Sequence, residues 1–133
     1  MQFLSRRLVM PNDLNYANSL FGGRALEWID EEAAIYAICQ LENNCFVTKH
    51  IGEITFESAA LQGDVVEFGF ATKKVGATSI TVTCLLRNKF TKKTICLADD
   101  IVFVQVDAQT RKPIPHGKTL EQLNKKAIEE MNT

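Results

Sequence analysis

A long segment without glycine or proline runs from Arg24 to Asn43, and its apolar residues follow a helical period. Apolar side chains also occur on other sides of the predicted helix, at Trp28, Ile35 and Ile38. A helix that is apolar around most of its circumference is typically buried. The rest of the chain must therefore enclose it. The residues that recur at helical spacing are Leu26, Ile29, Ala33, Tyr36, Ala37 and Leu41.

From Phe46 onward the apolar period changes to two, as in the alternating run from Val66 to Phe70. The first third of the chain is expected to be helical, the middle to form an antiparallel sheet of four or five strands, and residues 117–131 to form a peripheral helix. This is an α+β layout. A curved sheet wrapped around one long central helix, the hotdog arrangement, would bury such a helix. The length of 133 residues fits one domain, residues 1–133.

The composition excludes several classes of protein. A formal net charge of −1 gives no general attraction to nucleic acid or anionic lipid. No apolar run is long enough to span a membrane, and no signal peptide opens the chain, so we expect a cytoplasmic protein. The four cysteines form no CxxC pair and are expected to be buried free thiols. With only two histidines, neither beside a cysteine pair, we expect no metal.

A polar loop and a glycine pair precede the predicted helix. No dinucleotide-binding, P-loop or GxSxG motif occurs. Instead Asn15 lies in a loop rich in asparagine, and Gly22 and Gly23 open the helix. Glycines at a helix start leave backbone N–H groups unpaired, and these groups suit a carbonyl oxygen that becomes an oxyanion. The alternative is that the glycines form only a turn that leads into the helix.

Asp30 lies on the predicted apolar face of the helix, near Leu26, Ala33 and Ala37. A carboxylate there is costly unless it is paired or functional, so Asp30 is either a hydrogen-bonded structural acid or a general base. It lies seven residues after Gly23, about 10 Å along a helix. If both act on one substrate, the carboxylate comes from a neighbouring protomer. An obligate oligomer with shared sites is therefore predicted.

Three strings in this order and spacing carry a family resemblance: Met-Pro-Asn-Asp-Leu-Asn at 10–15, Phe-Gly-Gly at 21–23 and Trp-Ile-Asp-Glu-Glu-Ala at 28–33. They resemble the acyl-CoA hydrolase branch of the hotdog thioesterases, which includes the bacterial YciA-type enzymes and the eukaryotic cytosolic acyl-CoA thioester hydrolases. The resemblance extends over residues 9–106, through Val75-Gly76-Ala77-Thr78-Ser79-Ile80.

The resemblance implies an acyl-CoA thioesterase in which Asn15 and Asp30 form the catalytic pair, contributed by different subunits. The pair Gly22 and Gly23 would supply the N–H that polarises the thioester carbonyl. Dimers would assemble into hexamers as a trimer of dimers. Coenzyme A would take part only as a portion of substrate and product, with no other cofactor. It would contact Gly76, Thr78 and Ser79, with Lys74, or else Lys73 or Lys89, at its phosphates.

Two other functions are compatible with this fold. The first is a non-catalytic module that binds acyl-CoA or an acyl carrier. The second is an enoyl hydratase or dehydratase, which requires a catalytic histidine, and His50 is its only candidate. Arg24 departs from the family pattern, which often has Trp or Thr after the glycine pair, so the preference for acyl group or CoA is the least transferable property.

Overall fold

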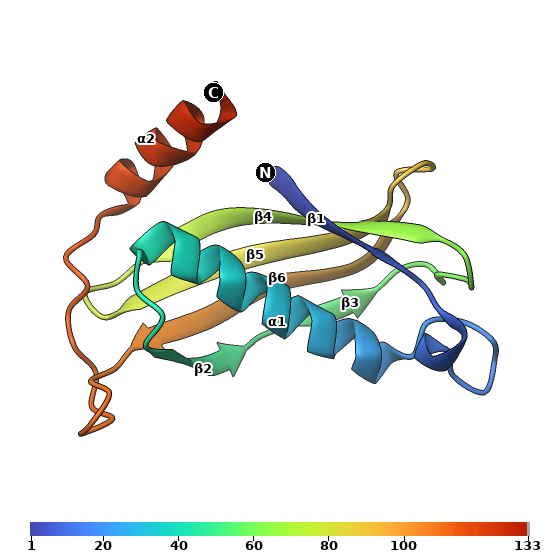
Figure 1. Cartoon of the computed structure of the whole chain (residues 1–133), viewed down its shortest axis with the longest axis horizontal. Coiled ribbons are helices and arrows are strands. Elements are labelled where there is room, and N and C mark those ends of the chain that lie inside the picture. Colours follow the sequence, from blue (N-terminus) through green and yellow to red (C-terminus); the bar gives the residue numbers. More distant parts are fainter. Residues whose placement is uncertain (133) are drawn as a thin grey trace.

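The computed structural model describes residues 1–132, which form one curved antiparallel sheet with a long helix across it (Figure 1). The elements in chain order are β1 (Gln2–Leu8), a 3-10 turn η1 (Pro11–Asp13), α1 (Gly22–Leu41), β2 (Phe46–Ile51), β3 (Ile54–Phe56), β4 (Val65–Val75), β5 (Ser79–Asn88), β6 (Thr94–Gln105) and α2 (Leu120–Met131).

The sheet has six strands in the order β1-β4-β5-β6-β2, and β3 also pairs with β6. The prediction of an α+β hotdog arrangement is confirmed. The expected four or five strands and the helical first third are wrong, because the chain opens with β1, which pairs with β4. The strands β2 and β3 share one edge, since they pair with successive parts of β6 from Ile101 to Gln105 and from Cys96 to Ala98.

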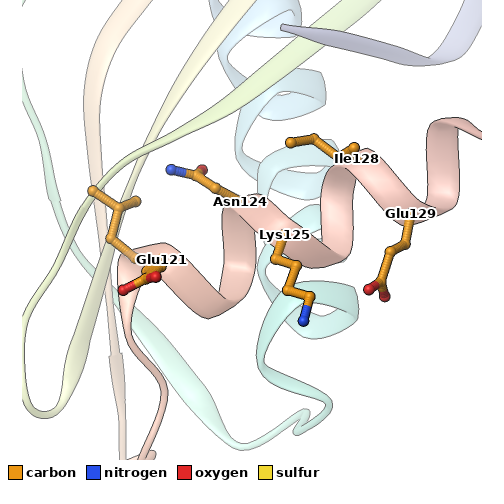
Figure 2. A pocket seen from close by; sticks show the side chains of 6 residues that line it. Glu121, Asn124, Lys125, Ile128 and Glu129 are labelled. Atoms are coloured by element: carbon orange, nitrogen blue, oxygen red, sulfur yellow. The ribbon is translucent and has the colours of Figure 1, made fainter.

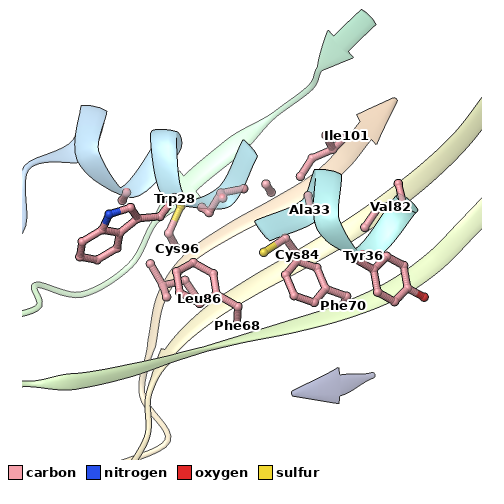
Figure 3. Packing of buried hydrophobic residues seen from close by; sticks show 14 of the residues in the cluster. Trp28, Ala33, Tyr36, Phe68, Phe70, Val82, Cys84, Leu86, Cys96 and Ile101 are labelled. Carbon is pink, nitrogen blue, oxygen red and sulfur yellow. The ribbon is translucent and has the colours of Figure 1, made fainter. Parts of the chain in front are cut away.

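The core lies between α1 and the concave face of the sheet (Figure 3). Phe68 and Phe70 alternate along β4 and both point toward the helix. Trp28 contacts Phe68 edge-on at a centroid distance of 6.4 Å, and Tyr36 stacks on Phe70 at 5.2 Å. Aromatic contacts of this kind add to the free energy that their burial contributes. They fix how α1 lies on the sheet, and with it the position of the helix start.

The helix is not buried on all sides in the single chain, contrary to the sequence prediction. Trp28 and Ala33 are buried, whereas Ile35 is 53% exposed and Cys39 is also exposed. The sheet covers one broad face of α1, and the opposite stripe of the helix has no layer above it. The exposed Cys39 also corrects the expectation of four buried thiols.

The sheet ends in β1 on one side and in β2 and β3 on the other, and neither edge has a further strand on its outer side within residues 1–132. At the β1 edge, Arg7 donates to Glu32 at 2.9 Å and to Glu31 at 3.1 Å, and its guanidinium lies 5.3 Å from the Trp28 ring. These contacts join β1 to α1. At the opposite edge, β2 has no neighbouring strand on its outer side within residues 1–132. An exposed edge strand presents unpaired N–H and C=O groups that can pair with another chain.

A nearly buried carboxylate lies on the convex face of the sheet. Glu67, on β4, is 3% exposed and accepts a hydrogen bond from Arg87 at 2.8 Å. Burial alone would raise the pKa of Glu67, but the hydrogen bond from Arg87 and the charges of Lys92 and Arg87 more than offset it. The net effect holds the pKa below its usual 4.5.

The depressed pKa of Glu67 predicts a pH dependence of stability. A carboxyl group whose pKa is lower in the folded state stabilises the fold above its unfolded pKa, and this contribution is lost as the pH falls through the folded pKa. We expect the free energy of unfolding to fall more steeply in the wild type than in Glu67→Gln between about pH 6 and pH 3. Denaturant titrations at fixed protomer concentration measure this, and equal slopes for the two proteins would contradict it.

The C-terminal helix α2 lies outside the sheet, as predicted (Figure 1). Leu123 is its one buried residue among those described, and Lys126 donates to the Cys39 carbonyl and Glu42 at the end of α1. None of the helices in the described part of the chain is both long and apolar enough to cross a membrane.

Candidate functional site

The loop before α1 is ordered by the side chain of Asn15. Its Oδ1 accepts the backbone N–H of Ala17 at 2.8 Å and that of Ser19 at 3.2 Å. Because both partners are donors, the oxygen of this amide is the atom that faces them. The Nδ2 group makes no hydrogen bond to any residue in the range 1–132. The half-buried Asn15 therefore presents two free N–H donors.

The start of α1 is uncapped. Phe21 at the N-cap position makes no side-chain hydrogen bond, and the first backbone bond within the helix runs from the N–H of Ala25 to the carbonyl of Phe21. The N–H groups of Gly22, Gly23 and Arg24 are thus left without a helical partner. The first turn holds no acidic side chain that would neutralise the positive end of the helix dipole. These donors suit a polar or negatively charged oxygen.

Asn15 and the helix start face one open hollow of about 420 Å³. The Phe56 ring is a wall of this hollow, and a Cβ atom at Gly22 would lie 3.5 Å from it. The sequence assigns no role to Phe56, Glu57 or Ser58, because long-range contacts bring them beside the helix: β3 pairs with β6, and the Leu20 N–H donates to the Ala60 carbonyl. The residues that line the hollow are Asn15, Ser19, Leu20, Gly22, Phe56, Glu57, Ser58 and Ala59.

Arg24 holds the Asn15 loop against the helix. Its guanidinium lies 3.6 Å from the Asp13 carboxylate and 3.8 Å from that of Glu27, and it donates to the Asn12 carbonyl at 3.5 Å. Asp13 in turn accepts the N–H of Met10 at 2.9 Å. The contacts of Arg24 are therefore with the loop, and Arg24 does not line the hollow.

Asp30 lies apart from that hollow. It is half-buried, so the face of α1 on which the sequence placed it is only partly covered at this residue. Its Oδ1 accepts a hydrogen bond of 2.9 Å from the hydroxyl of Thr48 on β2. The side chain therefore points along the free edge of the sheet. Since α1 is continuous from Gly22, Asp30 lies roughly 10 Å along the helix from Gly23, as the sequence indicated.

The predicted CoA-contacting segment lies at the other end of the molecule. The turn between β4 and β5 holds Gly76 and Thr78, and the Thr78 carbonyl accepts the N–H of Gln105 at 2.8 Å. Gln105 in turn pairs with Phe46, the first residue of β2, which follows shortly after the end of α1 (Figure 1). Gly22, in contrast, lies beside Phe56 at the opposite end of the helix. One chain therefore does not bring the two regions together.

A histidine of the tail holds this turn. His116 accepts the N–H of Lys118 on Nδ1 at 3.0 Å, so its proton lies on Nε2, which donates to the Ser79 carbonyl at 3.0 Å.

The two lysines before this turn differ in whether they are paired with acidic side chains. Lys73 is paired with Asp100 at 2.8 Å and Asp99 at 3.3 Å, and these partners raise its pKa. Lys74 is exposed and makes no side-chain hydrogen bond or ion pair within the described residues.

Other features of the chain do not form a site. A hollow of about 850 Å³ lies along α2 and is lined by that helix alone, from Leu120 to Glu129 (Figure 2). It brings together no polar groups from different elements. Among residues 1–132, no three His, Cys, Asp or Glu side chains are grouped to hold a metal ion. Cys84 and Cys96 face the core, and burial raises the pKa of both thiols, that of Cys96 to about 11.

Many solved structures are similar to this chain, and three of them illustrate the likeness. A point-mutant form of a hexameric broad specificity acyl-coenzyme A thioesterase is 25% identical, with a TM-score of 0.81 over 98% of this chain and 97% of that one. An apo hexameric acyl-CoA thioesterase is 30% identical, with a TM-score of 0.74 over 96% and 86%. A hexameric hotdog fold thioesterase of Campylobacter jejuni is 27% identical, with a TM-score of 0.70 over 91% and 92%.

A comparison with curated protein sequences gives no match. The family model described as "Thioesterase superfamily" matches residues 17–95, which is more than half of the chain. The matched range includes the glycine pair, Asp30 and the β4–β5 turn, and begins just after Asn15. The chain therefore belongs to the thioesterase superfamily.

Proposed function

We propose that this protein hydrolyses acyl-CoA thioesters to a free carboxylic acid and coenzyme A. One observation carries the proposal: the free amide N–H groups of Asn15 and the unpaired N–H groups of the α1 start lie at the same hollow. This donor set fits a thioester carbonyl that gains negative charge during attack. The similarity to solved acyl-CoA thioesterases supports the choice of substrate.

The proposed reaction begins with the thioester carbonyl placed at the helix start. The N–H of Gly23, with that of Gly22, donates to the carbonyl oxygen and stabilises the oxyanion. Asn15 donates through Nδ2 to the same oxygen or to the attacking water, and its Oδ1 remains committed to the loop. The absence of a side chain at Gly22 leaves the backbone of the helix start open to the thioester carbonyl beside Phe56.

The base in this proposal is Asp30 of the partner subunit. Its carboxylate takes a proton from water as the water oxygen bonds to the carbonyl carbon. The tetrahedral intermediate then collapses, the carbon–sulfur bond breaks, and the proton passes to the CoA sulfur. Water is the only co-reactant, so no cofactor or metal is required.

The free edge of β2 supports a shared site. Asp30 lies next to this edge through Thr48, and a second protomer that pairs along β2 would approach the carboxylate. The similar thioesterases are hexameric, so we propose dimers that assemble into hexamers. CoA would then reach Gly76, Thr78, Ser79 and Lys74 of a different protomer from the one that holds the carbonyl. The reducing cytoplasm, where the free cysteines stay reduced, is the proposed compartment.

Thr48 is expected to orient the base. In Thr48→Val the side chain keeps its shape but loses the hydroxyl that donates to Asp30, so we expect kcat to fall by about tenfold or more with little change in KM. Thr48→Ser, which keeps the hydroxyl, should retain most of the activity. Steady-state kinetics of the three proteins measure this, and wild-type kcat in Thr48→Val would contradict the orienting role.

The test of the proposed function is thiol release from purified protein with a panel of acyl-CoAs, from short to long chains and phenylacetyl-CoA. We expect turnover of at least one substrate and a ranking by acyl group. The alternative is a non-catalytic module that binds acyl-CoA or an acyl carrier. No release from any substrate, together with an acyl-CoA-dependent rise in melting temperature, would favour that alternative and contradict hydrolysis.

A further inference from the structure

Three cationic side chains contact a single carboxylate on the convex face of the sheet, and a fourth lies beside them. Glu67 lies 2.8 Å from Arg87, 3.4 Å from Lys92 and 3.8 Å from Arg6. Lys89 lies in the same β5–β6 hairpin as Lys92. We call Arg6, Arg87, Lys89 and Lys92 the basic surface. They come from β1, from β5 and from the hairpin, so the cluster depends on the fold and is not a run in the sequence.

The basic surface carries more positive charge than Glu67 can neutralise. Arg87, which makes the shortest of the three contacts, is enough to neutralise the single negative charge of Glu67. Lys92 and Arg6 both lower the pKa of Lys89, because like charges close to it disfavour its protonated form. The side chains of Arg6 and Lys92 remain 63% and 51% exposed. An anion from solution could therefore reach the surface and relieve this repulsion.

The hairpin holds its lysines in a defined geometry. Asn88 Oδ1 accepts the N–H groups of Phe90 and Thr91 at 2.9 and 3.0 Å. Lys92 has a φ of +64°, a left-handed conformation that side-chain-bearing residues adopt at some cost, and its N–H donates to the Asn88 carbonyl. The loop thus directs the Lys92 ammonium toward Glu67 instead of leaving it free in solvent.

An exposed aromatic ring lies beside these cations. Phe90 is 78% exposed at the tip of the hairpin, and the Lys89 ammonium is 5.6 Å from its ring centroid. Exposed aromatic rings next to cations are a common arrangement for nucleotides, because a base stacks on the ring while phosphates meet the charges. The other hairpin lacks this combination, since Lys73 there is paired with two aspartates.

We propose that the basic surface binds the phosphate groups of a nucleotide whose base stacks on Phe90. Two sources of this chemistry are possible: the phosphorylated nucleotide portion of acyl-CoA, or a separate nucleotide that binds away from the substrate. The site itself does not depend on hydrolysis, and only the assignment to acyl-CoA rests on the proposed function.

The direct test is calorimetric titration of the oligomeric protein with adenosine 3′,5′-bisphosphate and, separately, with adenosine. The variant is Lys89→Glu, because the ion-pair partners of the buried Glu67 are Arg6, Arg87 and Lys92, and the substitution leaves all three in place. The control is Lys93→Glu, the same charge change in the same hairpin at an exposed residue. We expect Lys89→Glu to weaken bisphosphate binding by at least about tenfold, with wild-type affinity in Lys93→Glu and much weaker binding of adenosine.

The aromatic contact has its own variants. Phe90→Ala should weaken bisphosphate binding by about fivefold or more. Phe90→Tyr should retain it, because stacking requires an aromatic ring and tyrosine also supplies one. Both changes lie at an exposed position, so the fold is expected to be unaffected. Equal binding by wild type and Phe90→Ala would overturn the stacking part of the proposal.

Kinetics distinguish the two sources. If the nucleotide is that of acyl-CoA, Lys89→Glu raises KM for acyl-CoA without changing kcat, and leaves hydrolysis of the matching acyl-pantetheine unchanged. If the nucleotide is separate, KM for acyl-CoA stays at the wild-type value while bisphosphate binding is lost. No bisphosphate binding by the wild type, or equal weakening by Lys89→Glu and Lys93→Glu, overturns the site. A changed oligomer mass in Lys89→Glu would overturn it in favour of an interface. Inactivity toward both thioesters would instead refute only the proposed function.

Discussion

Asp30→Asn is expected to lower kcat by about 10³-fold, the usual scale for removing a general base. Asparagine has nearly the same shape as aspartate, and its oxygen can still accept the hydroxyl of Thr48, so the side chain should keep its position. It cannot take a proton from water. Thiol release under substrate saturation measures the effect, and CoA affinity and oligomer mass should match the wild type.

The control for this substitution is Glu31→Gln, which removes the next carboxylate on the same helix at a side chain that is 52% exposed. It should leave kcat within about twofold, because an exposed ion pair contributes little. Full activity in Asp30→Asn would make Asp30 a structural acid. Equal losses in both variants would point to a general effect of charge on α1.

Phe68→Ala is expected to reduce the free energy of unfolding by about 3–5 kcal/mol, the typical cost of truncating a buried phenylalanine. Phe68 is 0% exposed and contacts Trp28 where α1 crosses the sheet. The cavity would lie beneath the helix that carries both the glycine pair and Asp30. Activity should therefore fall at temperatures below global unfolding.

Denaturant titration at one protomer concentration measures the loss of stability, since oligomer stability depends on concentration. Phe90→Ala provides the matched control, because Phe90 is 78% exposed and its truncation should change stability by less than about 0.5 kcal/mol. A loss below about 1 kcal/mol in Phe68→Ala would contradict the packing described for the core.

The sequence predicted the elements whose patterns are local. The helix from Gly22 and the strands β4 and β5 follow from clear periods of apolar residues, and β6 follows from a long, largely apolar run. It missed β1, whose side chains toward the helix include Ser5 and Arg7. The charge of Arg7 is tolerated there because its guanidinium pairs with Glu32 and lies over the Trp28 ring. These partners are 25 and 21 residues away in the chain. An edge strand of this kind leaves no apolar alternation to detect.

The candidate site was likewise predicted only where its residues are close in the sequence. The sequence placed Asn15 and the glycine pair close together, and Asn15 and Gly22 line one hollow. It placed Asp30 on the apolar face of the helix, but a helical projection gives a direction and not the width of the sheet below. This side chain lies where the sheet ends at Thr48 and is half-buried. The contact of His116 with Ser79 spans 37 residues and has no local signal.

The central claim is that each active site takes Asn15 from one protomer and Asp30 from another. Co-expression of Asn15→Ala and Asp30→Asn chains with different tags, followed by purification of the mixed oligomer, tests it through thiol release. Each variant alone should be inactive. If sites are shared within dimers, random pairing restores one intact site in mixed dimers, and about a quarter of wild-type activity should return. A mixed oligomer as inactive as its parents would show that each protomer carries its own complete site, and would contradict the account.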